Sequence, residues 1–164
     1  MSVTDELLRN NEAYAAAFDQ GDLPMPPGKQ VVVVACMDAR LDVYRILGLG
    51  LGEAHVVRNA GGVISEDAVR SLVISQRLLG TQEIILIHHT DCGMLTFRDD
   101  QVKDQITEEL GTRPSFALEA FPDPEDDVQQ SIGRLQANPF IAHKDQIRGF
   151  VFDVKTGRLN EVAA

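Results

Sequence analysis

Apolar residues along this chain fall into short continuous runs, and segments with helical periodicity separate these runs. The runs at residues 31–35, 54–57 and 83–87 consist largely of Val, Ile and Leu. Such runs are typical of strands that are covered on both faces in a parallel sheet. A fourth run at 147–154 leads through Thr156-Gly157 into residues 158–162. That dipeptide predicts a hairpin and an antiparallel edge strand.

The segments between these runs have the periodicity of amphipathic helices. In the helix predicted at residues 66–79, Ser65 is a suitable N-cap and Gly80 a suitable C-terminal end. The alternation of strand and helix predicts an α/β fold with a mostly parallel central sheet in the order 2-1-3-4, an antiparallel C-terminal edge strand and flanking helices. The predicted helices cover residues 42–47, 66–79, 99–110 and 124–137.

The first 28 residues predict an arm rather than part of the sheet. Residues 4–20 have a helical pattern with Thr4 as a plausible N-cap, and residues 21–28 carry three prolines and predict a loop. We expect residues 1–164 to form one domain with an N-terminal helical arm at about 4–28. The arm packs either on its own domain or on a second subunit, and the pattern favours neither.

Composition narrows the function classes. The chain has 164 residues, a formal net charge of -10 and a pI of about 4.7, which disfavours nucleic acid and anionic membrane surfaces. The sequence contains no apolar run of the roughly 20 residues that a membrane span needs. No signal peptide is recognisable at the N-terminus, so a cytoplasmic location is expected. In a reducing compartment the two cysteines favour a metal or catalytic role over a disulfide.

The candidate chemistry lies at the ends of the first and third strands. Cys36 follows the first strand, and His88-His89 and Cys92 follow the third. If these strands are neighbours, two sulfurs and one imidazole converge on one ion, and the fourth position stays open for water or substrate, as in catalytic zinc sites. The alternative is two buried structural thiols and a hydrogen-bonded core histidine. His88 points to the opposite face from His89, so we interpret it as packed or as supporting the site.

Asp38 and Arg40 lie two and four residues after Cys36. The Asp38 carboxylate can bind the metal as a fourth ligand and close the site, or it can pair with Arg40 and leave that position open. A third possibility is an ordinary surface ion pair, which contributes at most about 1 kcal/mol.

Three motifs together resemble those of the β-class carbonic anhydrases, in particular their compact, short branch. They are C-M-D-A-R at 36–40, R-N-A-G at 58–61 and H-T-D-C-G at 89–93. The resemblance implies a zinc enzyme with one Zn²⁺ per chain that reversibly hydrates carbon dioxide to bicarbonate and a proton by a zinc-bound hydroxide. It also implies a homodimer joined through N-terminal helices, with higher oligomers possible.

The resemblance also implies roles for individual residues. The zinc ligands would be Cys36, His89 and Cys92, with Asp38 as a fourth ligand in the closed state only. Asp38 and Arg40 would form a catalytic pair, and the backbone N–H of Gly93 would help to hold the substrate. Two alternatives stay open: a carbon disulfide or carbonyl sulfide hydrolase on the same site, or a catalytically closed zinc-binding regulatory protein.

Overall fold

A central sheet, seen in a computed structural model that describes residues 2–163, organises the chain. Within these residues the sheet has five strands in the order β2-β1-β3-β4-β5, and only the β4–β5 pair is antiparallel. The predicted order and the antiparallel edge are therefore confirmed. The strands are β1 (Val31–Cys36), β2 (Ala54–Asn59), β3 (Glu83–His89), β4 (Ile147–Phe152) and β5 (Leu159–Val162).

Helices connect and cover these strands, and their boundaries lie close to the predicted ones. The Ser65 side chain accepts a hydrogen bond from the Ala68 backbone N–H, and Gly80 ends the same helix in the left-handed conformation, as predicted. Asp42, predicted as a helical residue, is instead the N-cap of the short helix that follows it. The helices are α2 (Val43–Leu47), α3 (Glu66–Leu79), α4 (Asp99–Leu110) and α5 (Pro124–Ala137), with short 3₁₀ turns η1 (Ala60–Gly62) and η2 (Gly93–Leu95).

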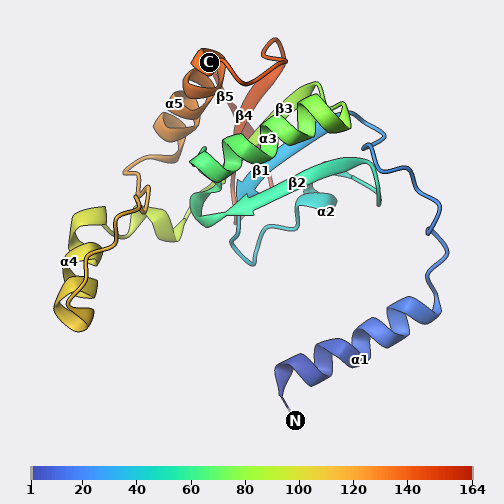
Figure 1. The fold of residues 1–164 in the computed structure, drawn as a ribbon, viewed down its shortest axis with the longest axis horizontal. Helices are drawn as coiled ribbons and strands as arrows, with labels where there is room; N and C mark the ends of the chain where they lie inside the picture. Colours follow the sequence, from blue (N-terminus) through green and yellow to red (C-terminus); the bar gives the residue numbers. More distant parts are fainter. Residues whose placement is uncertain (1, 164) are drawn as a thin grey trace.

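Strand β1 is buried on both faces, which explains its continuous apolar run. Val32 and Val34 face the side on which α3 and α5 lie, and pack with Leu72 and Val128 from these helices. Val33 and Ala35 face the other side, where the segment around α2 covers them (Figure 1). Because successive side chains of β1 point to opposite faces, the strand contributes to two apolar layers, one on each face of the sheet. Both layers extend to near the carboxyl edge of the sheet.

Helix α1 (Val3–Ala16) lies apart from the sheet in Figure 1. Its N-cap is Ser2 rather than the predicted Thr4, because Ser2 and Asp5 form a reciprocal capping box. The helix also ends at Ala16, four residues before the predicted end. Among its described side chains none is buried, although several are apolar.

The strands that carry the candidate ligands extend further than the apolar runs indicated. β1 includes Cys36 and β3 includes His89, so each of these residues is the last of its strand. By contrast, β4 ends at Phe152, before the predicted residue 154. Within residues 2–163, no helix has both the length and the apolar character needed to cross a membrane.

Candidate metal centre and active site

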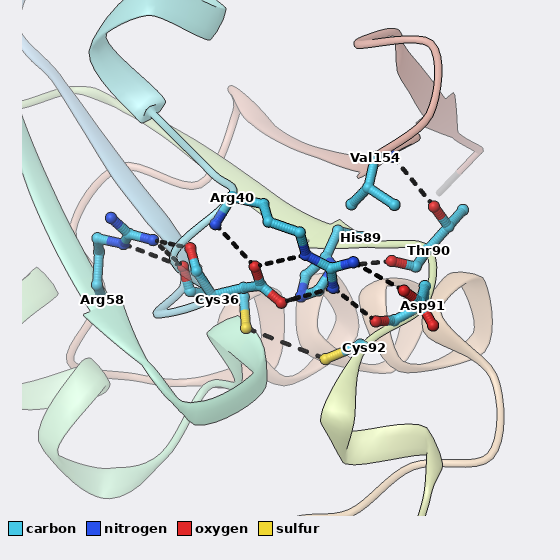
Figure 2. Close-up of polar contacts among 9 residues, drawn as sticks. Cys36, Arg40, Arg58, His89, Thr90, Asp91, Cys92 and Val154 are labelled. Atoms are coloured by element: carbon cyan, nitrogen blue, oxygen red, sulfur yellow. Dashed lines mark hydrogen bonds and ion pairs between the residues drawn. The ribbon is translucent and has the colours of Figure 1, made fainter.

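Cys36, His89 and Cys92 meet at the carboxyl edge of the sheet. β1 and β3 are parallel neighbours, with Ala35 opposite Ile87, so their ends lie side by side. One ligand atom from each of the three residues lies within 4.8 Å of the others, and all three residues are buried. The two sulfurs are 4.0 Å apart and face each other in Figure 2. The sequence-based expectation of convergence therefore matches the geometry.

The His89 ring is oriented for metal binding by its own turn. Its Nδ1 lies 2.8 Å from the Thr90 carbonyl oxygen, and because a carbonyl can only accept, Nδ1 carries the proton. The lone pair is then on Nε2, which is buried and has no hydrogen-bond partner within residues 2–163. A buried imidazole nitrogen with a free lone pair beside two sulfurs fits a zinc ion.

The two cysteines influence each other's protonation. A hydrogen bond from the Cys92 thiol lowers the pKa of Cys36, against the opposing effect of burial. The same hydrogen bond, together with burial, raises the pKa of Cys92. The pKa of His89 is raised on balance: burial opposes its charge, but the contact with Cys36 and the Thr90 carbonyl outweigh it. The pair of sulfurs thus readily releases a first proton, and a bound cation would favour release of the second.

The Asp38 carboxylate is hydrogen-bonded to Arg40 and does not point at the three candidate ligand atoms. Arg40 donates from Nε and Nη2 to the two carboxylate oxygens, at 2.9 and 2.8 Å, and its backbone N–H donates to the same carboxylate. These bonds lower the pKa of Asp38. The Asp38 Oδ2 atom lies 3.7 Å from His89 Nε2. Of the possibilities that the sequence left open, Asp38 therefore pairs with Arg40 and does not close the site as a fourth ligand.

Asp91 is a site residue that the sequence analysis missed. Its carboxylate and its carbonyl both accept hydrogen bonds from Arg40, at 2.7 and 2.8 Å. The backbone of Asp91 is left-handed, with φ of 54°, a conformation that Asp tolerates better than most residues. Its place between two candidate ligands was the available signal. Asp91 connects Arg40 to the turn that carries Cys92.

Arg58 is the second missed residue, although its motif was recognised. It lies near the end of β2 and donates three hydrogen bonds to the backbone carbonyls of Cys36 and Asp38. In Figure 2 it approaches the end of β1 from the side opposite Asp91. An arginine at the end of the strand next to a ligand strand was the signal that could have identified it.

His88 and Gly93 differ in their relation to the site. His88 points toward α5, as alternation along β3 predicts, where Nε2 lies 2.8 Å from the Asp127 carboxylate and the ring stacks on Phe121. It is fully buried and packed. Gly93 opens η2 directly after Cys92, and its carbonyl accepts from the N–H and hydroxyl of Thr96. Its predicted role in holding substrate stays a prediction.

Comparison with known proteins places these features in context. A family model described as carbonic anhydrase matches residues 31–159. The chain is 61% identical over 162 residues to β-carbonic anhydrase 1 of Mycobacterium tuberculosis, covering 99% of each protein. It is 30% identical over 182 aligned residues to a carbon disulfide hydrolase of Saccharolobus solfataricus, covering 96% of this chain and 87% of that protein.

Solved structures agree with these sequence matches. The crystal structure of a carbonic anhydrase from Streptococcus mutans has a TM-score of 0.93 at 41% identity, and the comparison covers 99% of each chain. A carbonic anhydrase from Glaciozyma antarctica has a TM-score of 0.92 at 47% identity, covering 99% of this chain and 100% of the other. The similarity extends over the sheet, the helices and the N-terminal arm alike.

Proposed function

Because this chain belongs to the β-carbonic anhydrase family, we propose that Cys36, His89 and Cys92 hold its zinc and that Asp38 and Arg40 act beside it. Family membership makes the activity the reversible hydration of carbon dioxide to bicarbonate and a proton, with zinc as the cofactor. The observation that carries the residue assignment is the buried Cys-His-Cys group next to a carboxylate that Arg40 holds by two bonds.

Each residue has a distinct task in this proposal. When bound, zinc supplies a Lewis acid that makes a water molecule acidic enough to react near neutral pH. The Thr90 carbonyl fixes the tautomer of His89, so that Nε2 is available as a ligand. Arg40 keeps Asp38 ionised, and the Asp38 carboxylate then accepts a hydrogen bond from the reacting water and orients it toward carbon dioxide. The backbone N–H of Gly93 contributes to holding the substrate.

Carbon dioxide is a better supported substrate than carbon disulfide. Both groups of relatives are similar along nearly the whole chain, but the identity is 61% to β-carbonic anhydrase 1 and 30% to the carbon disulfide hydrolase. The pairing of Asp38 with Arg40 also supports an open site over a permanently closed regulatory one, because the carboxylate oxygens are already engaged.

A stopped-flow assay of carbon dioxide hydration between pH 7 and 9, with elemental analysis, tests the proposal. We expect one zinc per chain and hydration that far exceeds sulfide release from carbon disulfide. Faster sulfide release would assign the hydrolase function instead. One zinc per chain with no hydration at any pH would support the closed regulatory protein. Cys36→Ser serves as the control, because it should lose both the metal and the activity.

The proposal includes a homodimer formed through the N-terminal arms, with further association possible, and a cytoplasmic location. Helix α1 has no buried side chain among those described, yet it exposes several large apolar residues that need a partner surface. A second copy of the same chain provides such a surface, because in a symmetric dimer the arm of each subunit packs on the other subunit. The exposed residues of the helix are Val3, Leu7, Leu8 and Tyr14, and the exposed Phe18 follows just after its end.

Light scattering coupled to size-exclusion chromatography tests the arm. The double variant Leu7→Glu, Leu8→Glu should shift the mass from that of a dimer toward that of a monomer, because charged side chains resist burial. Glu6→Gln, a substitution on the same helix that adds no charge, is the matched control. An unchanged mass for the double variant would place the interface elsewhere.

A further inference from the structure

The residues that follow β1 are hydrogen-bonded to the last residues of the neighbouring strand β2. The two strands are parallel, with Ala35 opposite Arg58 and Cys36 opposite Asn59. The ladder continues one step beyond the strands, since the Met37 N–H donates to the Asn59 carbonyl at 2.8 Å. Two consecutive residues of β2 therefore face the stretch that carries a candidate zinc ligand and the candidate catalytic carboxylate.

Arg58 binds the carbonyls on either side of this step. Its Nε and Nη2 donate to the Cys36 carbonyl at 3.0 and 2.9 Å, and Nη2 also donates to the Asp38 carbonyl at 2.7 Å. Asp38 is thus held at both ends, its backbone by Arg58 and its carboxylate by Arg40. Because Arg58 uses carbonyls and not the carboxylate, it does not compete with Arg40 for the reactive oxygens.

We propose that Arg58 is a positioning residue, whose guanidinium fixes the Cys36 and Asp38 carbonyls and so sets the Asp38 carboxylate relative to the metal ligands. The inference rests on the proposed function, since it assigns Arg58 a task in the same site. Arg58 touches neither the ligand atoms nor the carboxylate through any hydrogen bond in residues 2–163, so its effect is transmitted through the backbone of residues 36–38.

The shape of the guanidinium matters here more than its charge. A planar fork can reach two carbonyls at once, whereas the ammonium of a lysine is a single point that cannot reproduce the three bonds. Loss of the fork leaves the six paired positions of the β1–β2 ladder in place. The Arg58 side chain is also exposed, so its truncation opens no buried cavity. The fold should therefore survive the substitution, and the effect should be local.

The test compares Arg58→Met and Arg58→Lys with Arg148→Met in the zinc enzyme. Arg148 is a matched control, because it is also an exposed strand arginine and its fork binds Glu161 at the opposite edge of the sheet. For both Arg58 variants we expect kcat per bound zinc to fall about 10- to 100-fold, with KM within twofold of wild type, since a displacement of about 1 Å costs this much. Arg148→Met should keep the wild-type kcat.

The cobalt(II)-substituted protein provides a readout that does not depend on turnover. We expect the visible absorption bands of cobalt to shift in Arg58→Met, because Cys36 is displaced, and to stay unchanged in Arg148→Met. A kcat within twofold of wild type in Arg58→Met, or full activity in Arg58→Lys, would overturn the proposal. A wild-type protein that binds zinc but does not hydrate carbon dioxide would refute the proposed function instead, while the cobalt spectra would still report the positioning.

Discussion

Arg40 donates to both the carboxylate and the carbonyl of Asp91, at 2.7 and 2.8 Å, across the space between the exit of β1 and the turn after β3. The same guanidinium holds Asp38, so one side chain connects the two segments that provide the candidate ligands. The charge of Arg40 is stabilised by both carboxylates, which raise its pKa. Arg40 thereby fixes the segment after β1 relative to the turn after β3.

Asp91→Ala should loosen this connection without unfolding the protein. The Asp91 side chain is 75% exposed, so the lost ion pair should cost less than about 1 kcal/mol of the free energy of unfolding. The left-handed backbone at this position should add about 1 kcal/mol with alanine. We expect kcat for hydration to fall about tenfold, because Arg40 loses one of the groups that orient it. Stopped-flow assays and urea denaturation measure the two effects. Asp67→Ala, which removes an exposed partner of Arg70 on α3, should leave both unchanged.

Asp38→Ala should keep zinc and lose most of the turnover. The three ligand atoms do not depend on the Asp38 carboxylate, whereas a positioned acid–base group contributes about 10²- to 10⁴-fold to rate. Elemental analysis and the hydration assay separate the two properties. Asp42→Ala, at the N-cap of α2, is a control that removes a more exposed carboxylate outside the site. Wild-type turnover in Asp38→Ala would refute the role of the carboxylate.

Cys92→Ser should lose the metal. A serine hydroxyl stays protonated at neutral pH and is a poor ligand for a borderline-soft ion, so only Cys36 and His89 would remain. We expect less than about a tenth of the zinc of wild type after dialysis, with an unchanged far-ultraviolet circular dichroism spectrum. Full zinc occupancy in this variant would remove Cys92 from the site.

Gly62→Ala should destabilise the protein far more than Gly80→Ala. Both glycines have left-handed backbones, with φ of 71° and 76°. A Cβ on Gly62 would lie 2.8 Å from the Cys36 nitrogen and 3.0 Å from the Ile87 carbonyl oxygen, whereas one on Gly80 meets nothing within 4 Å. Backbone strain alone should cost about 1–2 kcal/mol at Gly80, and strain with the clash should cost more than about 3 kcal/mol at Gly62.

Urea denaturation of both alanine variants measures this difference, and zinc analysis shows whether the site moves with the backbone. Because Gly62 lies against the ends of both ligand strands, its variant should also bind zinc more weakly. Equal stabilities of the two variants would mean that β1 and β3 shift away from the added Cβ at residue 62 without a cost in the free energy of unfolding.

Asp99→Ala should reduce stability at neutral pH but not at acid pH. Burial by itself raises the pKa of Asp99, but hydrogen bonds from the N–H groups of residues 118–120 lower it on balance. A carboxylate with a lowered folded-state pKa stabilises the protein above its unfolded pKa of about 4, and this stabilisation is lost as the pH falls through the lower folded value.

Thermal midpoints between pH 3 and 7 test this sign. The difference between wild type and Asp99→Ala should be largest above about pH 4 and should shrink at lower pH. Asp100→Ala, a substitution at the next residue of the same helical turn, is the control. A difference that grows toward acid pH would contradict the assignment.

The sequence predicted the strands because apolar runs are short-range patterns, and it predicted the ligand group because the expected strand order brings the ends of β1 and β3 together. Apolar runs marked the strands, and the strand order placed Cys36 beside His89. The connections made by long side chains were not predictable in this way. Arg58 and Asp91 act through hydrogen bonds to groups far along the chain, and hydrophobic periodicity contains no information on which carbonyl an arginine reaches.

The start of the first helix shows a second limit. Ser2 and Thr4 are both good N-cap residues by type, and the apolar pattern allows either. The reciprocal hydrogen bonds between Ser2 and Asp5 make Ser2 the N-cap, because they satisfy two backbone N–H donors at once. Which surface the arm contacts is a property of the assembled protein, so it lies outside what a single chain's pattern specifies.

The pairing of β1 with β3 has a consequence for the order of events during folding. Cys36 and His89 are distant in sequence, and β2 and α3 lie between their neighbouring strands along the chain. Such non-local pairing is slow and follows the formation of local structure. The complete set of ligands therefore arises late, and zinc uptake during refolding should report the closure of the sheet rather than start it.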